Sequence, residues 1–505
     1  MNAVSPQAQF HTDDLDVVIV GAGISGIAMA VHLQRDCPDK RFVMLERRAE
    51  LGGTWDLFRY PGVRSDSDMY TMSLASEPWR EPDTLGQGHL IKGYLADVAK
   101  RHGLLERTRF GTRVIAADWN SDEARWHVEI ECDGLCRTLH ARYLHLASGY
   151  YDYDEPHVAD IAGREDFAGT ILHPQFWPEG FDYSGKRVVV IGSGATAVTL
   201  VPAMADAAAH VTMLQRSPTW IAPYPQRGKV ISSLRRFLPP QMAHNAIRWL
   251  SIRFQHRMFR RAREQPQATA QRILALVKKA LGDRFEAVHF TPDYAPWDQR
   301  LCVVPDNDLF EAMKADKASV VTDKIARIDA TGIALESGRH LDADVIVTAT
   351  GLKLAVAGKI AVSVDGVAVA WNEHIFYKGC MLSGLPNFSM VIVYSNTSAT
   401  LRSEIVAHWV CRVLRHMDAT GAAVVTPVPP PGVAITDESI LSLKSGYLLR
   451  SLHLMPRNGP ARPWRLDHDY LLDRDEMRKL PVDDGNLRFA AAPAPAEQRV
   501  LEAAE

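Results

Sequence analysis

The sequence predicts an α/β protein in which two similar strand–turn–helix units are separated by a helical segment. Short apolar runs at 16–20 and 187–191 have the length and composition of buried parallel strands. Each run is followed by a glycine-rich turn, a helical pattern and a second apolar run, at 42–45 and 211–214. Strand–helix–strand repeats build parallel sheets covered by helices, so we expect two such sheets in one chain.

Composition limits what the chain can be. It has 505 residues, with 57 Lys and Arg against 60 Asp and Glu, which predicts two or three domains and no nucleic-acid partner. Its six cysteines form neither a CxxC pair nor a Cys/His cluster, so we expect reduced thiols and no metal site. Residues 1–14 predict a flexible leader without a signal peptide. No apolar run is long enough for a transmembrane segment, and we expect a cytoplasmic protein.

The turn after the first strand carries a dinucleotide-binding motif. It reads Gly21-Ala22-Gly23-Ile24-Ser25-Gly26. In such a motif Gly21 permits the tight turn, Gly23 lets the backbone approach a pyrophosphate, and Gly26 lets the helix pack closely on the strand. Glu46 ends the second strand, where an acid can bind the hydroxyls of a ribose. Strand, spacing and acid together predict a Rossmann-like site suited to FAD.

The second turn, Gly192-Ser193-Gly194-Ala195-Thr196-Ala197, repeats the motif with Ala in its third small position. We expect cofactor contacts from Gly192, Ser193, Gly194 and Thr196. The second strand here ends in Arg216 and Ser217 instead of an acid. A carboxylate repels a 2′-phosphate, whereas an arginine can hold one with two hydrogen bonds, so this site is predicted to bind NADPH. The alternative is that Arg216 merely ends a strand at the surface.

Between the two units lies Phe167-Ala168-Gly169-Thr170-Ile171-Leu172-His173-Pro174-Gln175-Phe176-Trp177-Pro178. This stretch resembles the FxGxxxHxxxWP fingerprint of the type I Baeyer–Villiger monooxygenases, which are flavoproteins. Related flavin-containing and N-hydroxylating monooxygenases have a similar stretch without Trp-Pro. The resemblance runs from about residue 15 to 490, and the segments at 60–70 and 297–305 are most similar to the ethionamide-activating subgroup.

The resemblance implies further site residues. Gly52-Gly53-Thr54-Trp55 looks like the family's second FAD contact, which assigns cofactor binding to Gly53, Thr54 and Trp55. The segment 59–66 looks like its flavin-side loop and ends at the acid Asp66. The segment 344–351 fits the family's DxxxxATG strand and adds Thr350 and Gly351.

The resemblance also implies the catalytic arginine, because Trp297-Asp298-Gln299-Arg300 stands where the family places it. The family usually has Lys in place of Gln299, so NADPH preference here is expected to depend more on Arg216. Phe58 stands where many relatives have Asn, with no consequence that the sequence reveals.

The reaction implied by the resemblance begins with reduction of FAD by NADPH and continues with addition of O2 to give a C4a-peroxyflavin. This species attacks a ketone and yields an ester or lactone. An anionic oxidant and an alkoxide adduct need a fixed cation in a water-poor site, and we assign that role to Arg300, oriented by Asp66. Asp66 could instead be a helix cap or loop acid.

Three other functions remain open. One is heteroatom oxygenation of a sulfide, amine or thioamide by the same cofactors. Another is a flavin disulfide reductase, which would need a cysteine pair near the flavin, and the segment 52–70 has no cysteine. The last is a non-catalytic NADPH-binding module, which the pair of Asp66 and Arg300 argues against. His173 is expected at the domain junction and not in the chemistry.

The segment from about 225 to 300 is basic and helical in pattern, with Ala243, Ile247, Leu250, Phe254 and Met258 at helical spacing. It could lie on a membrane surface or bind a partner helix. We favour a helical insert that packs this apolar face on the protein and leaves its arginines in water.

The expected domain boundaries follow from these features. An FAD-binding domain is predicted over 1–150 and 381–505, and an NADPH-binding domain over 151–224 and 325–380. A helical insert is predicted over 225–324. Residues 427–431 are expected to form a stiff connector, and the tail from 490 to be poorly ordered.

Overall fold

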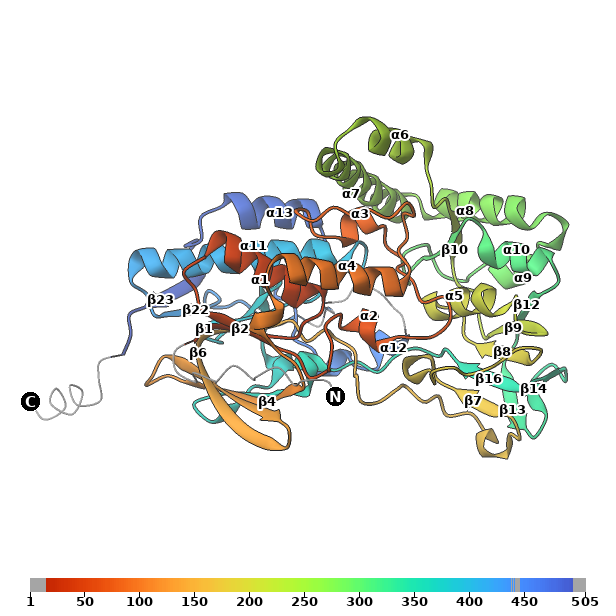
Figure 1. Ribbon diagram of the computed structural model, residues 1–505, viewed down its shortest axis with the longest axis horizontal. Helices are drawn as coiled ribbons and strands as arrows, with labels where there is room; N and C mark the ends of the chain where they lie inside the picture. The colour runs from red at the N-terminus through yellow and green to blue at the C-terminus, as the bar shows by residue number, and fades with distance from the viewer. Residues whose placement is uncertain (1–14, 437, 439, 441–445, 494–505) are drawn as a thin grey trace, which may run out of the picture.

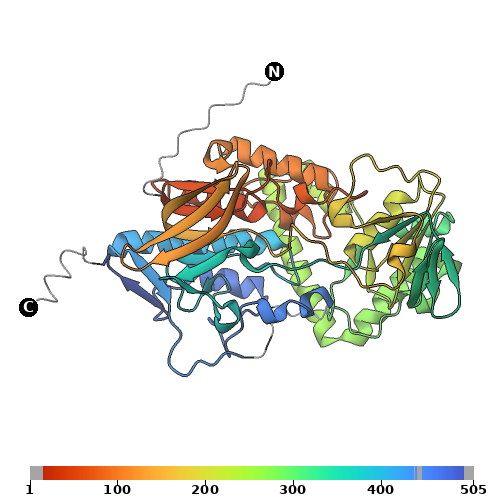
Figure 2. The ribbon, with the colours of Figure 1, turned by 90° about the horizontal axis from the view of Figure 1, so that it is seen from below.

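The computed structural model describes residues 15–436, 438, 440 and 446–493. The expected leader, 1–14, lies outside them, as does most of the expected tail. Two sheets lie side by side, one near each end of the molecule, and helices cover them (Figures 1 and 2). No helix in the described part of the chain is long and apolar enough to cross a membrane.

The first unit is built on a nine-stranded sheet. Its order is β18-β17-β4-β5-β6-β1-β2-β3, with β21 also beside β6. The predicted strands are present as β1 (Leu15–Val20) and β2 (Phe42–Leu45), which pair in parallel next to the edge strand β3. The other strands are β3 (Thr108–Arg109), β4 (Thr112–Asn120), β5 (Arg125–Cys132), β6 (Leu135–Leu146), β17 (Ala361–Val364), β18 (Val367–Ala368) and β21 (Phe388–Met390).

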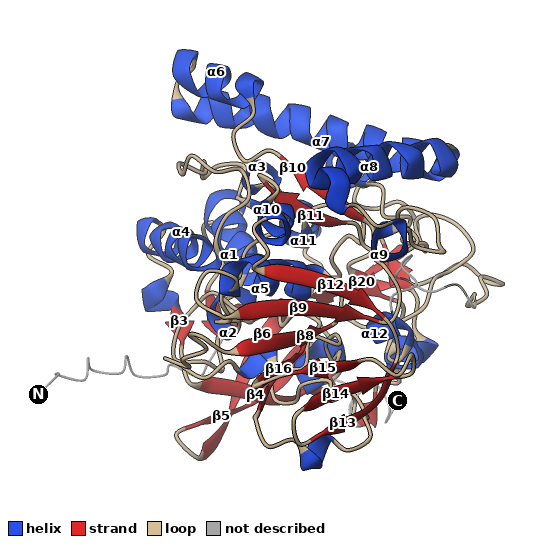
Figure 3. Cartoon of the chain, turned by 90° about the vertical axis from the view of Figure 1, so that its right-hand side faces the viewer, coloured by secondary structure: helices blue, strands red, loops and turns tan. Residues whose placement is uncertain are grey.

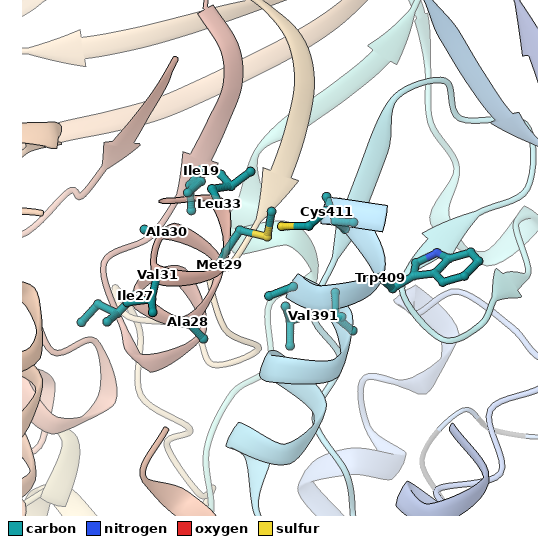
Figure 4. Close-up of a cluster of buried hydrophobic side chains, with 14 of the residues drawn as sticks. Ile19, Ile27, Ala28, Met29, Ala30, Val31, Leu33, Val391, Trp409 and Cys411 are labelled. Carbon is teal, nitrogen blue, oxygen red and sulfur yellow. The ribbon is translucent and has the colours of Figure 1, made fainter. Parts of the chain in front are cut away.

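Helices cover the first sheet. They are α1 (Ile24–Asp36), α2 (Thr54–Leu57), α3 (Met69–Met72), α4 (Gly88–Arg101), α11 (Ala399–Thr420) and α13 (Tyr470–Lys479). The short helix α12 (Gly446–Leu449) lies between the two units (Figure 1). The packing of α1 on α11 forms the largest part of the core. Met29 of α1 and Cys411 of α11 point toward one another there, and Trp409 is fully buried nearby (Figure 4). The chain's last helices are therefore joined to its first one.

The second unit is built on a five-stranded parallel sheet with the order β12-β9-β8-β16-β7. Its strands are β7 (Thr170–Leu172), β8 (Arg187–Ile191), β9 (His210–Gln215), β12 (Ala318–Thr322) and β16 (Val345–Thr348). Helices α5 (Ala195–Met204) and α10 (Asp308–Lys314) pack on it, and β13 (Ile325–Asp329), β14 (Gly332–Leu335) and β15 (His340–Asp342) form a small antiparallel sheet beside it. The five-stranded sheet faces the viewer in Figure 3.

The helical segment consists of α6 (Lys229–Phe237), α7 (Pro240–Glu264), α8 (Pro266–Leu281) and α9 (Ala287–Phe290). Helices α6 and α7 form an outer layer at the edge of the molecule (Figures 1 and 3). The predicted apolar face of this segment is only partly packed. Ala243 and Ile247 are buried, but Leu250 and Phe254 are exposed. The helix contacts the protein again farther along, where Ala262 is buried, so the exposed apolar side chains lie between two packed parts of α7.

The strand pairings contradict two of the expected domain boundaries. The helical insert was expected to extend to 324, but β11 (Cys302–Pro305) pairs with β10 (Ile221–Tyr224), and β12 is an edge strand of the second sheet. The second unit was expected to extend to 380, but β17 pairs with β4 of the first sheet. In both places a short apolar strand lacks a glycine motif, so its sheet cannot be read from its own sequence.

Two crossing segments connect the units and run side by side. Tyr151 and Leu354 form a β-bridge, and the Asp152 amide donates to the Lys353 carbonyl at 2.8 Å. Lys359 Nζ lies 2.7 Å from the buried Asp152 carboxylate. Other short elements are β19 (Phe376–Tyr377), β20 (Met381–Leu382), β22 (Val424–Pro427) and β23 (Leu487–Ala490). The expected connector at 427–431 therefore begins as the end of a strand.

Candidate functional site

Both glycine-rich turns open into one cavity between the units, with a volume of about 1020 Å³. The carboxyl ends of parallel strands in the two sheets face it, which is where open α/β sheets bind ligands. Nearly all of the residues predicted from the motifs line this cavity: Gly21, Gly23, Glu46, Gly53, Thr54, Trp55, Asp66, Gly192, Ser193, Gly194, Thr196, Arg216, Ser217, Arg300, Thr350 and Gly351. Gly26 is the exception, since it lies buried beneath the turn.

The first turn is held by close backbone contacts. Gly21 has a φ of +106°, and a Cβ there would lie 2.6 Å from the Ala147 carbonyl oxygen. A Cβ on Gly26 would lie 1.9 Å from the Gly21 carbonyl oxygen. Gly23 approaches Gly53 of the next turn, whose φ is +55°. These contacts bring two glycine turns together at one end of the cavity, so that backbone N–H groups can approach a phosphate.

Glu46 holds the same turn through its side chain. One carboxylate oxygen accepts from the Ala22 amide at 2.8 Å and the other from the Arg48 amide at 2.9 Å. Burial raises the pKa of Glu46 above its ordinary value, although both amide donors act in the opposite direction. Each carboxylate oxygen has a second lone pair, so Glu46 can hold the turn and still accept from a ribose hydroxyl.

The second turn repeats this geometry with one difference. Gly192 has a φ of +133°, and a Cβ there would lie 2.3 Å from the Ala349 carbonyl oxygen. The position of Gly26 is taken by Ala197, which is fully buried. No atom lies within 4 Å of a Cβ built on Gly194. The Ser193 hydroxyl bonds the Thr219 hydroxyl at 2.7 Å.

The end of β9 presents a cation to the cavity. Gln215 points inward and donates to the His289 carbonyl and the Thr322 hydroxyl, both at 2.8 Å. Arg216 and Ser217 follow and are exposed at the cavity wall. Lys324, which sequence reasoning missed, lines the cavity as well and lies 3.6 Å from Glu336. Glu336 also lines the cavity and offsets the charge of Lys324, so Arg216 is the cation that the strand end offers to a phosphate monoester.

The loop 59–66 crosses from the first unit to the second. Gly62 has a φ of +73°, and a Cβ there would lie 2.5 Å from Ala203 of α5. Arg64 donates to Asp308 of the second unit and, at 3.4 Å, to the Val198 carbonyl. Arg64 is therefore an interface residue, and its charge is compensated by Asp308.

This loop ends at Asp66, which faces Arg300. The Arg300 Nη2 donates to one Asp66 oxygen at 2.8 Å, and Nε lies 2.7 Å from the other. This bidentate geometry fixes the plane of the guanidinium. Both side chains keep about a third of their surface exposed. Arg300 lies two residues before β11 (Cys302–Pro305), which helps to position it, and the pair lies where the two units meet.

Helix α7 supports the segment before Arg300. Trp297 has a φ of +71° and meets Phe259 edge to face at 5.6 Å. Asp298 accepts from Arg263 at 2.7 Å. Gln299 lines the cavity beside Arg300, at the position where the resembled family usually has a lysine.

The family fingerprint has structural roles here. A Cβ on Gly169 would lie 2.5 Å from the Asp344 carbonyl oxygen, which seats β7 at the edge of the second sheet. His173 lines the cavity, accepts from the Gln175 amide at 3.2 Å, and has its pKa lowered to about 4 by burial. The Gln175 side chain donates to the Asp152 carbonyl at 2.6 Å. His173 thus lies at the junction of the units, as expected.

An aromatic wall of the cavity consists of Phe58, Tyr60, Tyr150 and Tyr151. Phe58 and the loop that contains Tyr60 were expected near the flavin, whereas Tyr150 and Tyr151 were missed from the sequence. Phe58 meets Tyr60 and Tyr151 edge to face at 6.0 and 6.3 Å, and the two hydroxyls of Tyr150 and Tyr151 lie 2.8 Å apart. Burial raises the pKa of Tyr60 to about 12. The sequence contains a signal for these two tyrosines. Ala147-Ser148-Gly149 follows β6 directly before Tyr150, and it is similar to Ala349-Thr350-Gly351, which follows β16.

The thiols do not form a redox pair at the cavity. Cys302 is the single cysteine among the described residues that line it, and burial raises the pKa of Cys302 to about 12. Dithiol chemistry needs a partner thiol and a reactive thiolate. The site therefore does not match a flavin disulfide reductase.

Known proteins were compared with this chain. The family model described as pyridine nucleotide-disulphide oxidoreductase matches residues 18–235. The FAD-containing monooxygenase EthA of Mycobacterium tuberculosis is 47% identical over 486 residues, with 96% of this chain and 99% of that protein covered. EthA of Mycolicibacterium smegmatis is 44% identical over 480 residues, with 95% and 97% covered.

Solved structures share the fold. A steroid monooxygenase bound to NADP has a TM-score of 0.74 at 23% identity, with 94% of this chain and 99% of that chain covered. A cyclohexanone monooxygenase bound to ε-caprolactone has a TM-score of 0.72 at 21% identity, with the same coverage. The extent and identity of the match to the EthA proteins show that the chain belongs to the family of FAD-containing monooxygenases, in the group that includes EthA.

Proposed function

We propose that this monooxygenase uses NADPH and O2 to insert one oxygen atom into ketones, giving esters or lactones. The observation that carries the proposal is the Arg300–Asp66 pair, which lies in one cavity with both glycine turns. A cation fixed between two dinucleotide sites suits a reaction in which negative charge develops on oxygen.

The residues present fit both cofactors. FAD fits the first turn, because Gly21, Gly23 and Gly53 bring backbone close to where its pyrophosphate would lie, and Glu46 suits a ribose. NADPH fits the second turn, because the open Gly194 leaves room for a pyrophosphate and Arg216 suits a 2′-phosphate. Bound together, they would supply the reducing equivalents and the activation of O2.

The protein itself would contribute a cation in a fixed position and a site that is shielded from water. Arg300 would hold negative charge on the reacting oxygen atoms, and its planar fork is fixed by Asp66. Asp66 also offsets part of the charge of Arg300, so that the guanidinium does not bind an anion too tightly. Phe58 and Tyr151 supply apolar surface that limits the access of water and accommodates an apolar substrate.

A second candidate is oxygenation of a heteroatom in a sulfide, amine or thioamide. The solved steroid monooxygenase and cyclohexanone monooxygenase are only 23% and 21% identical to this chain, so they support the fold and not the substrate. The EthA relatives at 44–47% identity are named for FAD and not for a ketone.

Product analysis distinguishes the two candidates. Purified enzyme is given NADPH, O2 and a panel of linear, cyclic and aryl ketones plus a thioether and a thioamide. We expect ester or lactone in amounts that match the NADPH consumed for at least one ketone. Sulfoxide or S-oxide with no ester from any ketone would overturn the ketone proposal in favour of the second candidate.

A further inference from the structure

The outer surface of α6 and α7 exposes large apolar side chains that the fold does not cover. Helix α6 buries none of its residues. Phe237 is 77% exposed, Phe254 62% and Trp249 51%. We call this surface the outer face and define it by its exposed residues: Lys229, Val230, Arg236, Phe237, Met242, Trp249, Leu250, Arg253, Phe254, Arg257 and Arg261.

The outer face is strongly basic. Residues 226–263 contain ten Lys and Arg and no Asp or Glu, although the whole chain has a formal charge of −3. Some of these cations are used inside the protein: Arg248 is buried, and Arg227 and Arg263 are paired with Asp83 and Asp298. Arg235 donates to the carbonyls of Arg80 and Glu81, and Arg260 pairs with Glu264 at the end of α7. The remaining cations lie among the apolar side chains: Lys229, Arg236, Arg253, Arg257 and Arg261.

The apolar and basic residues of α7 share one side of the helix. At 3.6 residues per turn, the seven outer-face residues from Met242 to Arg261 fall within about 140° of arc. The Arg253 guanidinium stacks on Trp249, with its carbon 3.7 Å from the ring centroid. Tryptophan and arginine together suit a boundary between water and an apolar phase. A helix with cations beside large apolar side chains is typical of one that lies in a membrane interface.

The opposite side of α7 is fixed to the protein. Arg248 pairs with Glu404 and donates to the carbonyls of Tyr70 and Ser73, both at 2.8 Å. Gln255 accepts from Thr397 at 2.6 Å, and Thr397 lines the cavity. The outer face is therefore presented by a rigid helix whose inner side adjoins the cavity.

We propose that the outer face docks on the surface of a lipid bilayer that contains anionic headgroups. The cations would meet the headgroups, and the apolar side chains would enter the boundary between headgroups and acyl chains. A second copy of this chain fits the face poorly, since a two-fold contact would oppose one set of cations to the same set. A nucleic acid would use the cations but leave the phenylalanines exposed. Docking is independent of which substrate is oxidised.

Vesicle flotation of the full-length, flavin-loaded enzyme tests the proposal. One set of vesicles contains phosphatidylcholine and phosphatidylglycerol, and the other contains phosphatidylcholine alone. One double variant, Phe237→Ser with Phe254→Ser, removes apolar surface, and another, Arg253→Glu with Arg257→Glu, reverses charge. Matched controls change exposed residues away from this face: Val367→Ser on β18 and Arg339→Glu between β14 and β15.

We expect the parent and both controls to float with the anionic vesicles and to be released by high salt. Each double variant is expected to bind at least about tenfold more weakly, because two phenylalanines or two cations are lost from the contact. Retained flavin and NADPH oxidation would show that the variants fold.

Four results would overturn the proposal: no flotation of the parent, equal flotation with both kinds of vesicle, double variants that bind like the controls, or binding of a duplex oligonucleotide in place of vesicles. A parent that sediments as a dimer, becomes a monomer on Phe237→Ser with Phe254→Ser, and does not float would show that a second copy covers the face instead.

Discussion

The two dinucleotide units share a turn and differ around it. In both, the first glycine has a positive φ and rests on the carbonyl of an alanine, Ala147 in one unit and Ala349 in the other. In the first unit the second strand ends in Glu46, and in the second it ends in Arg216. The shared part can bind the pyrophosphate that both cofactors have, whereas the strand end meets the ribose where they differ. We infer from this comparison that the turn indicates a dinucleotide and that the strand end selects which of the two dinucleotides binds.

The largest effect on flavin content and stability is expected at Gly26, because the two turns differ in packing there and the second turn has Ala197 at the same position. Gly26→Ala would place a Cβ 1.9 Å from the Gly21 carbonyl oxygen, so helix and strand must separate at a cost of about 3 kcal/mol. We expect the variant to lose its flavin and unfold at lower temperature, as measured by flavin per chain and thermal melting. Gly194→Ala is the matched control, since its Cβ has open space. That variant should keep its flavin and bind NADPH more weakly. Full flavin content in Gly26→Ala would contradict this account of the first turn.

The next largest effect is on the amount of product formed per NADPH, and it distinguishes Arg300 from Arg64 at the junction of the units. Arg300→Ala is expected to lower the product formed per NADPH by ~10²–10³, the cost of removing a group that stabilises developing negative charge, with the NADPH consumed appearing as hydrogen peroxide. Asp66→Ala should be milder, and the two losses should not add, because Asp66 acts through Arg300. Arg64→Ala is the control, since Arg64 pairs with Asp308. If Arg64→Ala uncouples the reaction and Arg300→Ala does not, the roles are reversed.

A smaller effect, on the pH dependence of the unfolding free energy, distinguishes the two units. His145 is fully buried in β6 of the first unit, with Nδ1 2.8 Å from the Ser389 hydroxyl, and burial lowers the pKa of His145 from 6.5 to about 3. Val347, two residues before Ala349, is the counterpart in the second unit. As pH falls below 6.5, the unfolded chain takes up a proton at His145 that the folded chain does not, so stability falls, by about 2 kcal/mol at pH 5.

His145→Val should therefore reduce the dependence of the unfolding free energy on pH between 6.5 and 5 by about one proton. Chemical denaturation at several pH values measures it. Ser389→Ala keeps the imidazole buried and should keep the slope. An unchanged slope in His145→Val would show that His145 does not contribute.

Sequence patterns predicted the parts of the fold that carry strong local signals. The strands Phe42–Leu45 and Arg187–Ile191 have the expected bounds, because the first apolar run lies between Arg41 and Glu46 and the second ends at a glycine turn. The motif residues gather at one cavity. The sheet to which β12 and β17 belong could not be predicted, since a short apolar strand does not encode its partner. The apolar spacing over 243–258 indicated a helix, but it could not show that Leu250 and Phe254 stay exposed while Ala243 and Ile247 are buried.

The central claim is that the first unit binds FAD and the second binds NADPH, and that the strand ends make the distinction. The most direct test is to titrate both cofactors into Glu46→Gln and Arg216→Ala. Glu46→Gln should weaken FAD binding, because an amide cannot accept from both the Ala22 and Arg48 N–H groups, and should leave NADPH affinity unchanged. Arg216→Ala should keep its flavin and lose on the order of tenfold to a hundredfold in preference for NADPH over NADH, the value of a charge-assisted hydrogen bond. Gln299→Lys should tighten NADPH binding. Equal losses for NADPH and NADH in Arg216→Ala, or loss of flavin in that variant, would contradict the assignment.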